Sequence, residues 1–213
     1  MRIEAMQKLT RDQLMPLEQY AKQRNDFRAK VMAHKKDRQV QIGPNATLYF
    51  EDRLTMHYQV QEMLRIEKVF EAYAINEELE AYKPLIPDGH NWKATFMIEY
   101  EDPEERARQL AGMIGIEDKV WLQVADCQRI YPIADEDLQR DNDLKTSSVH
   151  FLRFELTPVM IAAVHSGASV SAGIEHPAAA AGQDRCCSRQ QDGIEAGAVA
   201  GRRLQDGESA AEK

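Results

Sequence analysis

Apolar residues in the first third of the chain recur mostly at three- and four-residue spacing, the period of an amphipathic helix. This pattern predicts one long helix over residues 17–36 and a clearer one over residues 54–73. A buried stripe on the second helix is expected from six residues: Val60, Met63, Leu64, Val69, Phe70 and Tyr73. A shorter helix over residues 77–82 should end before Pro84, because proline disfavours helix in the residue that precedes it.

Short runs of alternating or β-branched residues, bounded by turn residues, follow these helices and predict strands. The turn Gly43-Pro44-Asn45 separates two such runs and predicts a β-hairpin of residues 40–42 and 46–50. Four further strands are expected, the middle two as a pair, at residues 93–100, 120–125, 129–134 and 149–156. Three short helices complete the pattern, at residues 103–112, 135–143 and 158–165.

The order of these elements predicts the fold class. Strands that follow one another in pairs favour antiparallel pairing, and the glycine-rich strand-to-helix turn of a doubly wound parallel sheet is absent from the sequence. We therefore expect an α+β protein with a mostly antiparallel sheet of five or six strands. One face of this sheet is expected to pack against the long N-terminal and central helices. Residues 1–176 should form this single domain.

The composition of the chain changes after His176-Pro177. Residues 177–213 contain nine Ala and five Gly, no aromatic residue, and few large aliphatic side chains. Such a segment buries too little apolar surface to offset the entropy lost on ordering. A disordered tail, or at most a loosely attached helix, is expected there.

Overall charge and composition narrow the classes of protein. The chain has 27 Lys and Arg against 35 Asp and Glu, a net charge of −8, which argues against broad nucleic-acid binding. A short basic cluster at residues 34–38 could contact a phosphate, but it is also typical of a helix C-terminus. The longest purely apolar run is residues 159–164, too short for a membrane span. With no apolar signal core at the start and three cysteines without Cys-x-x-Cys spacing, we expect a cytoplasmic protein.

Common catalytic signatures are missing from the sequence. There is no Walker A motif, no G-x-G-x-x-G, no H-E-x-x-H, no G-x-S-x-G and no E-x-x-H pair of the di-iron type. These absences do not exclude catalysis, so whether the protein is an enzyme stays open. No spacing specifies a cofactor.

The densest group of polar residues spans the end of the hairpin and the second long helix. Four of them lie at i, i+3, i+4 and i+7 and share one helix face: Tyr58, Gln61, Glu62 and Arg65. A buried carboxylate or guanidinium must pair or bind something. This face therefore predicts either a pocket for an anionic ligand or a metal, or a structural ion-pair network. The candidate ligand-binding residues are Glu51, Arg53, Tyr58, Gln59, Glu62, Arg65 and His150.

His150 is placed in this set by its titration range, because imidazole changes charge near neutral pH. Strand alternation puts His150 on the same face as Leu152 and Phe154. A histidine on an apolar face is also well explained as a core residue that hydrogen-bonds to its surroundings. A set of carboxylate, amide and imidazole groups would suit Fe, Mn or Zn, but the spacing selects none of them.

Several long blocks of sequence resemble, in order, the bacterial family called domain of unknown function 3501. The blocks are HKKDRQVQIGPNATLYFEDRLTMHYQVQEMLRIEKVFE (residues 34–71), DGHNWKATFMIEY (88–100), LAGMIGIEDKVWLQV (110–124) and KTSSVHFLRFEL (145–156). The resemblance covers roughly residues 6–177. The chain departs from the family pattern after residues 173–177, so we consider the tail a lineage-specific extension or the product of a reading-frame shift. Resequencing together with the intact mass of the native protein would decide between them.

The resemblance implies an association rather than an activity. Proteins of this family are expected to be encoded beside a rubrerythrin-like protein and an iron–sulfur oxidoreductase. The leading hypothesis is therefore an accessory, partner-binding protein of a redox or peroxide-metabolism system. The alternative is a metal- or anion-binding enzyme that uses the Glu/Arg/Gln pocket on the second long helix.

Overall fold

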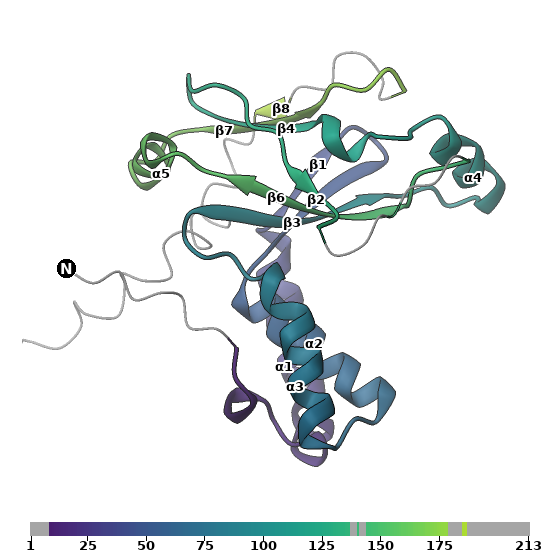
Figure 1. Ribbon diagram of the computed structural model, residues 1–213, viewed down its shortest axis with the longest axis vertical. Helices are drawn as coiled ribbons and strands as arrows, with labels where there is room; N and C mark the ends of the chain where they lie inside the picture. The colour runs from purple at the N-terminus through teal and green to yellow at the C-terminus, as the bar shows by residue number, and fades with distance from the viewer. Residues whose placement is uncertain (1–8, 137–139, 141–143, 179–184, 187–213) are drawn as a thin grey trace, which may run out of the picture.

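The computed structural model describes residues 9–136, 140, 144–178 and 185–186. Figure 1 shows two parts: a head built from two β-sheets, and a stalk of helices that extends from one end of the head. The stalk consists of η1 (Arg11–Gln13), α1 (Leu17–Lys36), α2 (Arg53–Glu67), α3 (Ala72–Tyr82) and η2 (Lys83–Leu85).

The larger sheet of the head has five antiparallel strands in the order β1-β2-β3-β6-β5. Their bounds are β1 Gln39–Ile42, β2 Ala46–Glu51, β3 Asn91–Ile98, β6 Val149–Glu155 and β5 Ile133–Ala134. Alternation along β3 sends Trp92, Ala94, Phe96 and Ile98 into the core.

A second, three-stranded antiparallel sheet covers one face of the first (Figure 1). It consists of β4 (Val120–Val124), β7 (Val170–Ile174) and β8 (Arg185–Cys186), in that order. The head core lies between the two sheets and includes residues of two short helices, α4 (Pro103–Ala111) and α5 (Pro158–His165). The short η3 (Glu117–Lys119) leads into β4. Leu48, Leu122 and Phe154 are almost fully buried in this core.

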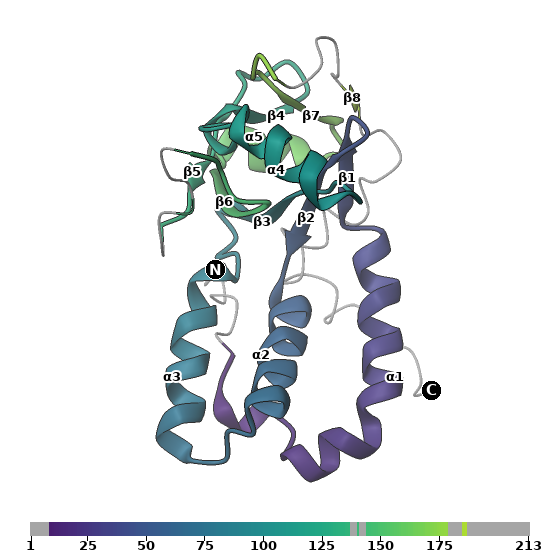
Figure 2. The ribbon, with the colours of Figure 1, turned by 90° about the vertical axis from the view of Figure 1, so that its right-hand side faces the viewer.

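All three stalk helices attach to the same end of the larger sheet. β1 begins and β2 ends at neighbouring positions, with Gln39 opposite Tyr49, so the end of α1 and the start of α2 lie together. β3 begins at this end too, and α3 precedes it. As Figure 2 shows, α2 lies between α1 and α3. The stalk has a small core of its own, centred on Leu9, Val60, Leu64 and Leu79.

The α+β class and the mostly antiparallel sheet of five strands are confirmed. The position of the long helices differs from the expectation, because α1 and α2 extend from one end of the sheet instead of lying across one of its faces (Figure 2). The core face of the sheet is covered by the second sheet, whose strand β7 the sequence pattern did not predict.

The helix expected over residues 54–73 is two helices. α2 ends at Glu67 because Lys68 adopts the left-handed conformation, with φ 54°. Phe70 and Tyr73 were expected in the buried stripe, but their exposed fractions are 69% and 68%. The break turns both side chains away from the stalk core.

The pair expected from residues 120–125 and 129–134 forms only in part. A single bridge joins Leu122 to Ile130, while β4 pairs with β7 and β5 pairs with β6. The helix expected over residues 135–143 and most of the tail over 177–213 lie outside the described residues. Within that tail, Arg185–Cys186 form β8, which pairs with β7. No helix in the described part of the chain is long and apolar enough to cross a membrane.

Gly173 provides a test of the second sheet. It lies opposite Trp121, and a β-carbon at position 173 would come within 2.6 Å of Cε2 and 2.9 Å of Nε1 of the buried indole. Gly173→Ala should therefore lower the free energy of unfolding by about 1–3 kcal/mol, measured by urea denaturation. Gly112→Ala is the control, since its β-carbon would meet nothing closer than 3.6 Å. Equal stability of both variants would contradict this packing.

Candidate functional site

Glu62 on α2 links the first two stalk helices. Its carboxylate accepts hydrogen bonds from Tyr20 Oη at 2.6 Å and from Arg24 Nε and Nη2 at 2.8 and 2.7 Å, both on α1. Arg65, one turn along α2, donates to the same two oxygens at 3.3 and 3.2 Å. Both carboxylate oxygens are therefore occupied by donors of the protein itself.

This network changes the acidity of its members. Hydrogen bonds from Arg24 are the main reason that the pKa of Glu62 is lowered to about 2, against the opposing effect of burial. Burial, together with the bond to Glu62, raises the pKa of the Tyr20 phenol. Glu62 is ionised and Tyr20 is protonated throughout the neutral range, and the pair acts as a fixed connection between α1 and α2.

Gln61, the neighbour of Glu62, holds the segment before α1 against α2. Its fully buried side chain accepts from the Met15 N–H at 3.0 Å and donates to the Met15 carbonyl at 2.9 Å. One side-chain amide thus satisfies both backbone groups of Met15. The sequence placed Gln61 on the polar helix face, and the structure gives it this internal contact.

The other four candidate residues of this region lie in four different places. Glu51 lies on β2, where Thr95 donates to its Oε1 at 2.7 Å and its buried Oε2 has no hydrogen-bond partner. Arg53 is the first residue of α2. The Tyr58 ring lies 6.1 Å from that of Phe27 on α1, whereas Gln59 lies near Tyr82 on α3. The structure brings Tyr58, Glu62 and Arg65 together with α1 and leaves Glu51, Arg53, Gln59 and His150 outside that group.

Asp52, between β2 and α2, was not among the candidates but connects the head to the stalk. Its carboxylate caps α2 by accepting from Thr55 N at 2.9 Å. It also lies 2.7 Å from His34 Nε2 and 3.4 Å from Arg38 Nη2. Burial alone would raise the pKa of Asp52, but Arg38, the Thr55 N–H and His34 together lower it. Arg38 is only 2% exposed. Two residues of the basic cluster 34–38, His34 and Arg38, therefore contact Asp52 inside the protein.

His150 lies in the core of the head, far along the chain from the α2 residues. Its Nδ1 is 2.6 Å from Asp135 Oδ2, and its Nε2 is 3.1 Å from the Ser147 carbonyl and 3.0 Å from Thr146 Oγ1. The hydroxyl of Thr146 donates to Glu117 at 3.4 Å. His150 is fully buried and anchors the segment between β5 and β6. Within the described ranges, no group of three or more His, Cys, Asp or Glu residues is arranged to hold a metal ion.

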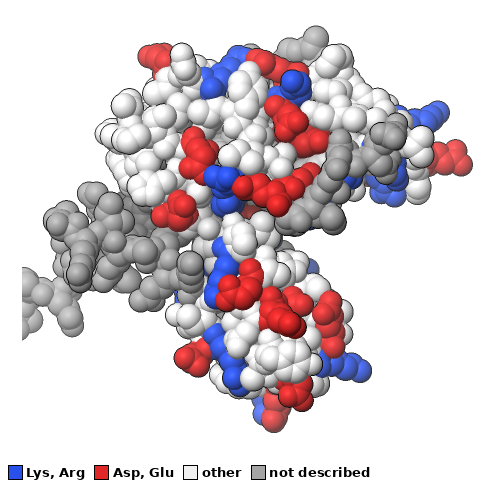
Figure 3. All heavy atoms as spheres, viewed as in Figure 1, with Lys and Arg blue, Asp and Glu red and all other residues white. Residues whose placement is uncertain are grey.

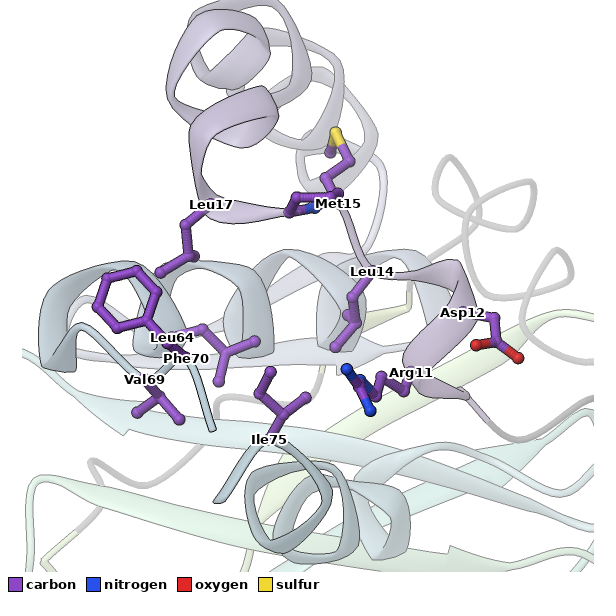
Figure 4. Close-up of a pocket in the computed structure, with 10 residues that line it drawn as sticks. Arg11, Asp12, Leu14, Met15, Leu17, Leu64, Val69, Phe70 and Ile75 are labelled. Carbon is purple, nitrogen blue, oxygen red and sulfur yellow. The ribbon is translucent and has the colours of Figure 1, made fainter. Parts of the chain in front are cut away.

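A pocket of about 510 Å³ lies toward the far end of the stalk (Figure 4). It is lined by the segment before α1, the start of α1, the end of α2, the α2–α3 connection and the start of α3. Most of its lining is apolar: Leu14, Leu17, Leu64, Val69, Phe70 and Ile75. Three large apolar side chains in the same region are well exposed, with exposed fractions of 59% for Ile66, 69% for Phe70 and 68% for Tyr73. We call these three side chains and the pocket the apolar tip.

The apolar residues of this region are visible in the sequence, but their spacing predicts that they are buried. Phe70 and Tyr73 extend the apolar spacing of α2 and were expected to be buried with Val69. The left-handed residue Lys68 ends that periodicity, and a pattern of apolar positions does not reveal where a helix breaks.

Known proteins similar to this chain are described as proteins of unknown function. A family described as "Protein of unknown function (DUF3501)" matches residues 8–184. A crystal structure described as a novel protein of unknown function from Burkholderia pseudomallei K96243 is 48% identical, with a TM-score of 0.82. The similarity covers 90% of this chain and 98% of that one. No protein with a curated description matches the chain.

Replacing Glu62 should reveal the strength of the link between α1 and α2. Because the folded pKa lies near 2, below that of an unfolded glutamate, the stabilisation is present above about pH 5 and is lost as pH falls toward 2. Glu62→Gln should lower the free energy of unfolding at pH 7 by about 2–3 kcal/mol. The difference from the original chain should shrink as urea denaturation is repeated down to pH 2.

The control is Glu18→Gln, which breaks the exposed pair of Glu18 with Lys22 on the same helix. Exposed pairs contribute little, so this variant should unfold like the original chain. A Glu62→Gln variant with unchanged stability at pH 7 would show that the network is not structural.

A second substitution tests the buried group in the head. His150→Leu leaves Asp135 and Glu117 buried without the imidazole between them, and it should lower the free energy of unfolding by about 2–4 kcal/mol. His165→Leu, at the exposed end of α5, should leave stability nearly unchanged. Thermal unfolding of the two variants side by side measures this, and similar values for both would contradict an anchoring role.

Proposed function

The chain belongs to the DUF3501 family, and we propose that it is a partner-binding accessory protein of a bacterial redox or peroxide-metabolism system in the cytoplasm. The observation that carries the proposal is the apolar tip. Phe70 and Tyr73 are each more than two-thirds exposed beside an apolar pocket, at the part of the stalk farthest from the head. Contiguous exposed apolar surface beside a pocket is characteristic of sites that bind other proteins.

The shape of the molecule supports this interpretation. The head holds the larger core. The connection between α2 and α3, which contributes Phe70 to the apolar tip, lies at the end of the stalk away from the head (Figure 1). The cross-links of Glu62 and Gln61 hold α1, α2 and the segment before α1 together. A surface held in place in this way loses little conformational entropy when it binds.

The redox part of the proposal comes from the family resemblance alone. It names an iron–sulfur oxidoreductase and a rubrerythrin-like protein as the partners to test. The alternative, a metal- or anion-binding enzyme that uses Glu62 and Arg65, finds less support. Both oxygens of Glu62 accept from the protein's own donors, and the Arg65 guanidinium already faces that carboxylate.

Binding to an iron–sulfur oxidoreductase and to a rubrerythrin-like protein from the same organism tests the proposal. Each would be purified and titrated with the chain by isothermal calorimetry. We expect one of them to bind, and Phe70→Ser to weaken that binding about tenfold or more, because exposed aromatic side chains dominate such interfaces. The matched control is Val159→Ser, an apolar side chain on the head that is 70% exposed. It should bind like the original chain.

Two results would overturn the proposal. One is the absence of binding to either protein at concentrations up to roughly 0.1 mM, where even weak complexes form. The other is equal weakening by Phe70→Ser and Val159→Ser, which would place the contact elsewhere. Circular dichroism of each variant verifies that its fold is intact.

A further inference from the structure

We propose that the apolar tip binds a basic protein segment, which places an apolar side chain in the pocket and lysine or arginine side chains against Glu67, Glu77 and Glu78. This inference rests on the proposed function, because it names the chemistry of the partner that the apolar tip binds. It does not depend on which protein supplies the segment.

The pocket is suited to an apolar side chain. Leu14 lines it from the segment before α1 and Leu17 from the start of α1, while Val69 and Ile75 line it from the α2–α3 connection and α3 (Figure 4). Its volume of about 510 Å³ is within the range of pockets that enclose bound groups. Phe70 stands at its edge and is 69% exposed, so an inserted side chain would also cover this ring.

The carboxylates beside the apolar tip are not neutralised by the protein. Among the described residues, the Lys and Arg ion pairs along the stalk helices use Glu18, Glu62 and Glu80, and none uses Glu67, Glu77 or Glu78. Burial and the nearby charges of Glu67 and Glu77 raise the pKa of Glu78. Glu67 and Glu77 therefore both repel Glu78, and cations of a partner would relieve that repulsion.

Charge also selects among the possible occupants. Arg11 and Asp12 both line the pocket and carry opposite charges. Residues 66–79, which include the lining residues Val69, Phe70 and Ile75, contain one lysine, Lys68, and four acidic residues: Glu67, Glu71, Glu77 and Glu78. Figure 3 shows an uncharged area near the end of the stalk among mostly acidic side chains. A second copy docked tip to tip would bring these like charges together, because a two-fold contact matches a patch with itself. A basic partner fits the site better than a second copy.

Two synthetic peptides serve as probes. Both are amphipathic helices of about four turns with the same leucine face and a single fluorophore, and their polar faces carry either lysine or glutamate. Fluorescence anisotropy with the full chain should give a dissociation constant about tenfold or more lower for the lysine peptide than for the glutamate peptide. Added salt should weaken the lysine peptide and not the glutamate peptide.

Three variants locate the binding. Phe70→Ser should weaken the lysine peptide about tenfold or more by removing the apolar contact. The triple variant Glu67→Gln, Glu77→Gln, Glu78→Gln should weaken it to a similar extent and flatten the salt dependence. The control triple variant Glu101→Gln, Glu104→Gln, Glu105→Gln removes the same charge from exposed residues of the head and should change neither. The stalk triple variant should melt no lower than the original chain, because it removes carboxylates that repel one another.

Each contrary result has its own meaning. Equal weakening by the two triple variants would show attraction to net charge alone and overturn the inference. Light scattering that shows a dimer, abolished by Phe70→Ser, would assign the apolar tip to a second copy and also overturn it. Binding of the oxidoreductase that depends on Phe70 but not on the stalk carboxylates would overturn this inference and leave the proposed function standing. Selective binding of the lysine peptide without oxidoreductase binding would support this inference and overturn the proposed function.

Discussion

A single carboxylate, that of Asp52, holds the two parts of this molecule in their arrangement. β2 ends at Glu51 and α2 begins at Arg53, so one residue joins the sheet to the stalk. Asp52 caps α2 through the Thr55 N–H and faces His34 and Arg38 at the end of α1. The end of α1, the end of β2 and the start of α2 therefore meet at this residue. Its low pKa means that it stays charged across the neutral range, when the cap and the ion pair are strongest.

The rest of the stalk follows from that junction. Helices that extend side by side from one end of a sheet do not pack into the head core. They must therefore bury their apolar surface against one another. Their own core is small, centred on four residues, and polar side chains provide the other contacts. Glu62 joins α1 to α2, and Gln61 satisfies the backbone of Met15. The polar residues that suggested a ligand site are, for the most part, engaged in holding the stalk together.

The apolar residues of the same region behave in the opposite way. Lys68 ends α2 with a left-handed residue, and the chain turns before α3 begins at Ala72. Phe70 and Tyr73 therefore face outward beside the pocket. In the stalk, the charged side chains bind one another, whereas the aromatic side chains face outward. This arrangement favours the binding of a partner protein over catalysis at this end of the molecule. No curated protein matches the chain, and the family is described as one of unknown function.

Local patterns were enough for much of the fold and for part of the candidate site. Strand alternation and turn residues predicted β1, β2, β3 and β6, and the helix face of Gln61, Glu62 and Arg65 was recognisable from spacing. These features depend on residues within one or two turns of each other, which a sequence displays directly. His150 was correctly placed among apolar residues, but its partner Asp135 lies 15 residues away and was not foreseen.

The sequence by itself determined the α+β class, the approximate bounds of five strands, the starts of most helices, and the polar face of α2. Only the tertiary structure decided that the second sheet covers the first, that Arg24 and Tyr20 reach Glu62 across 38 and 42 residues, and that Phe70 is exposed. The physical reason is that burial depends on which surfaces meet. An apolar side chain is core where another element covers it and an interface where none does, and its spacing along the chain is the same in both cases.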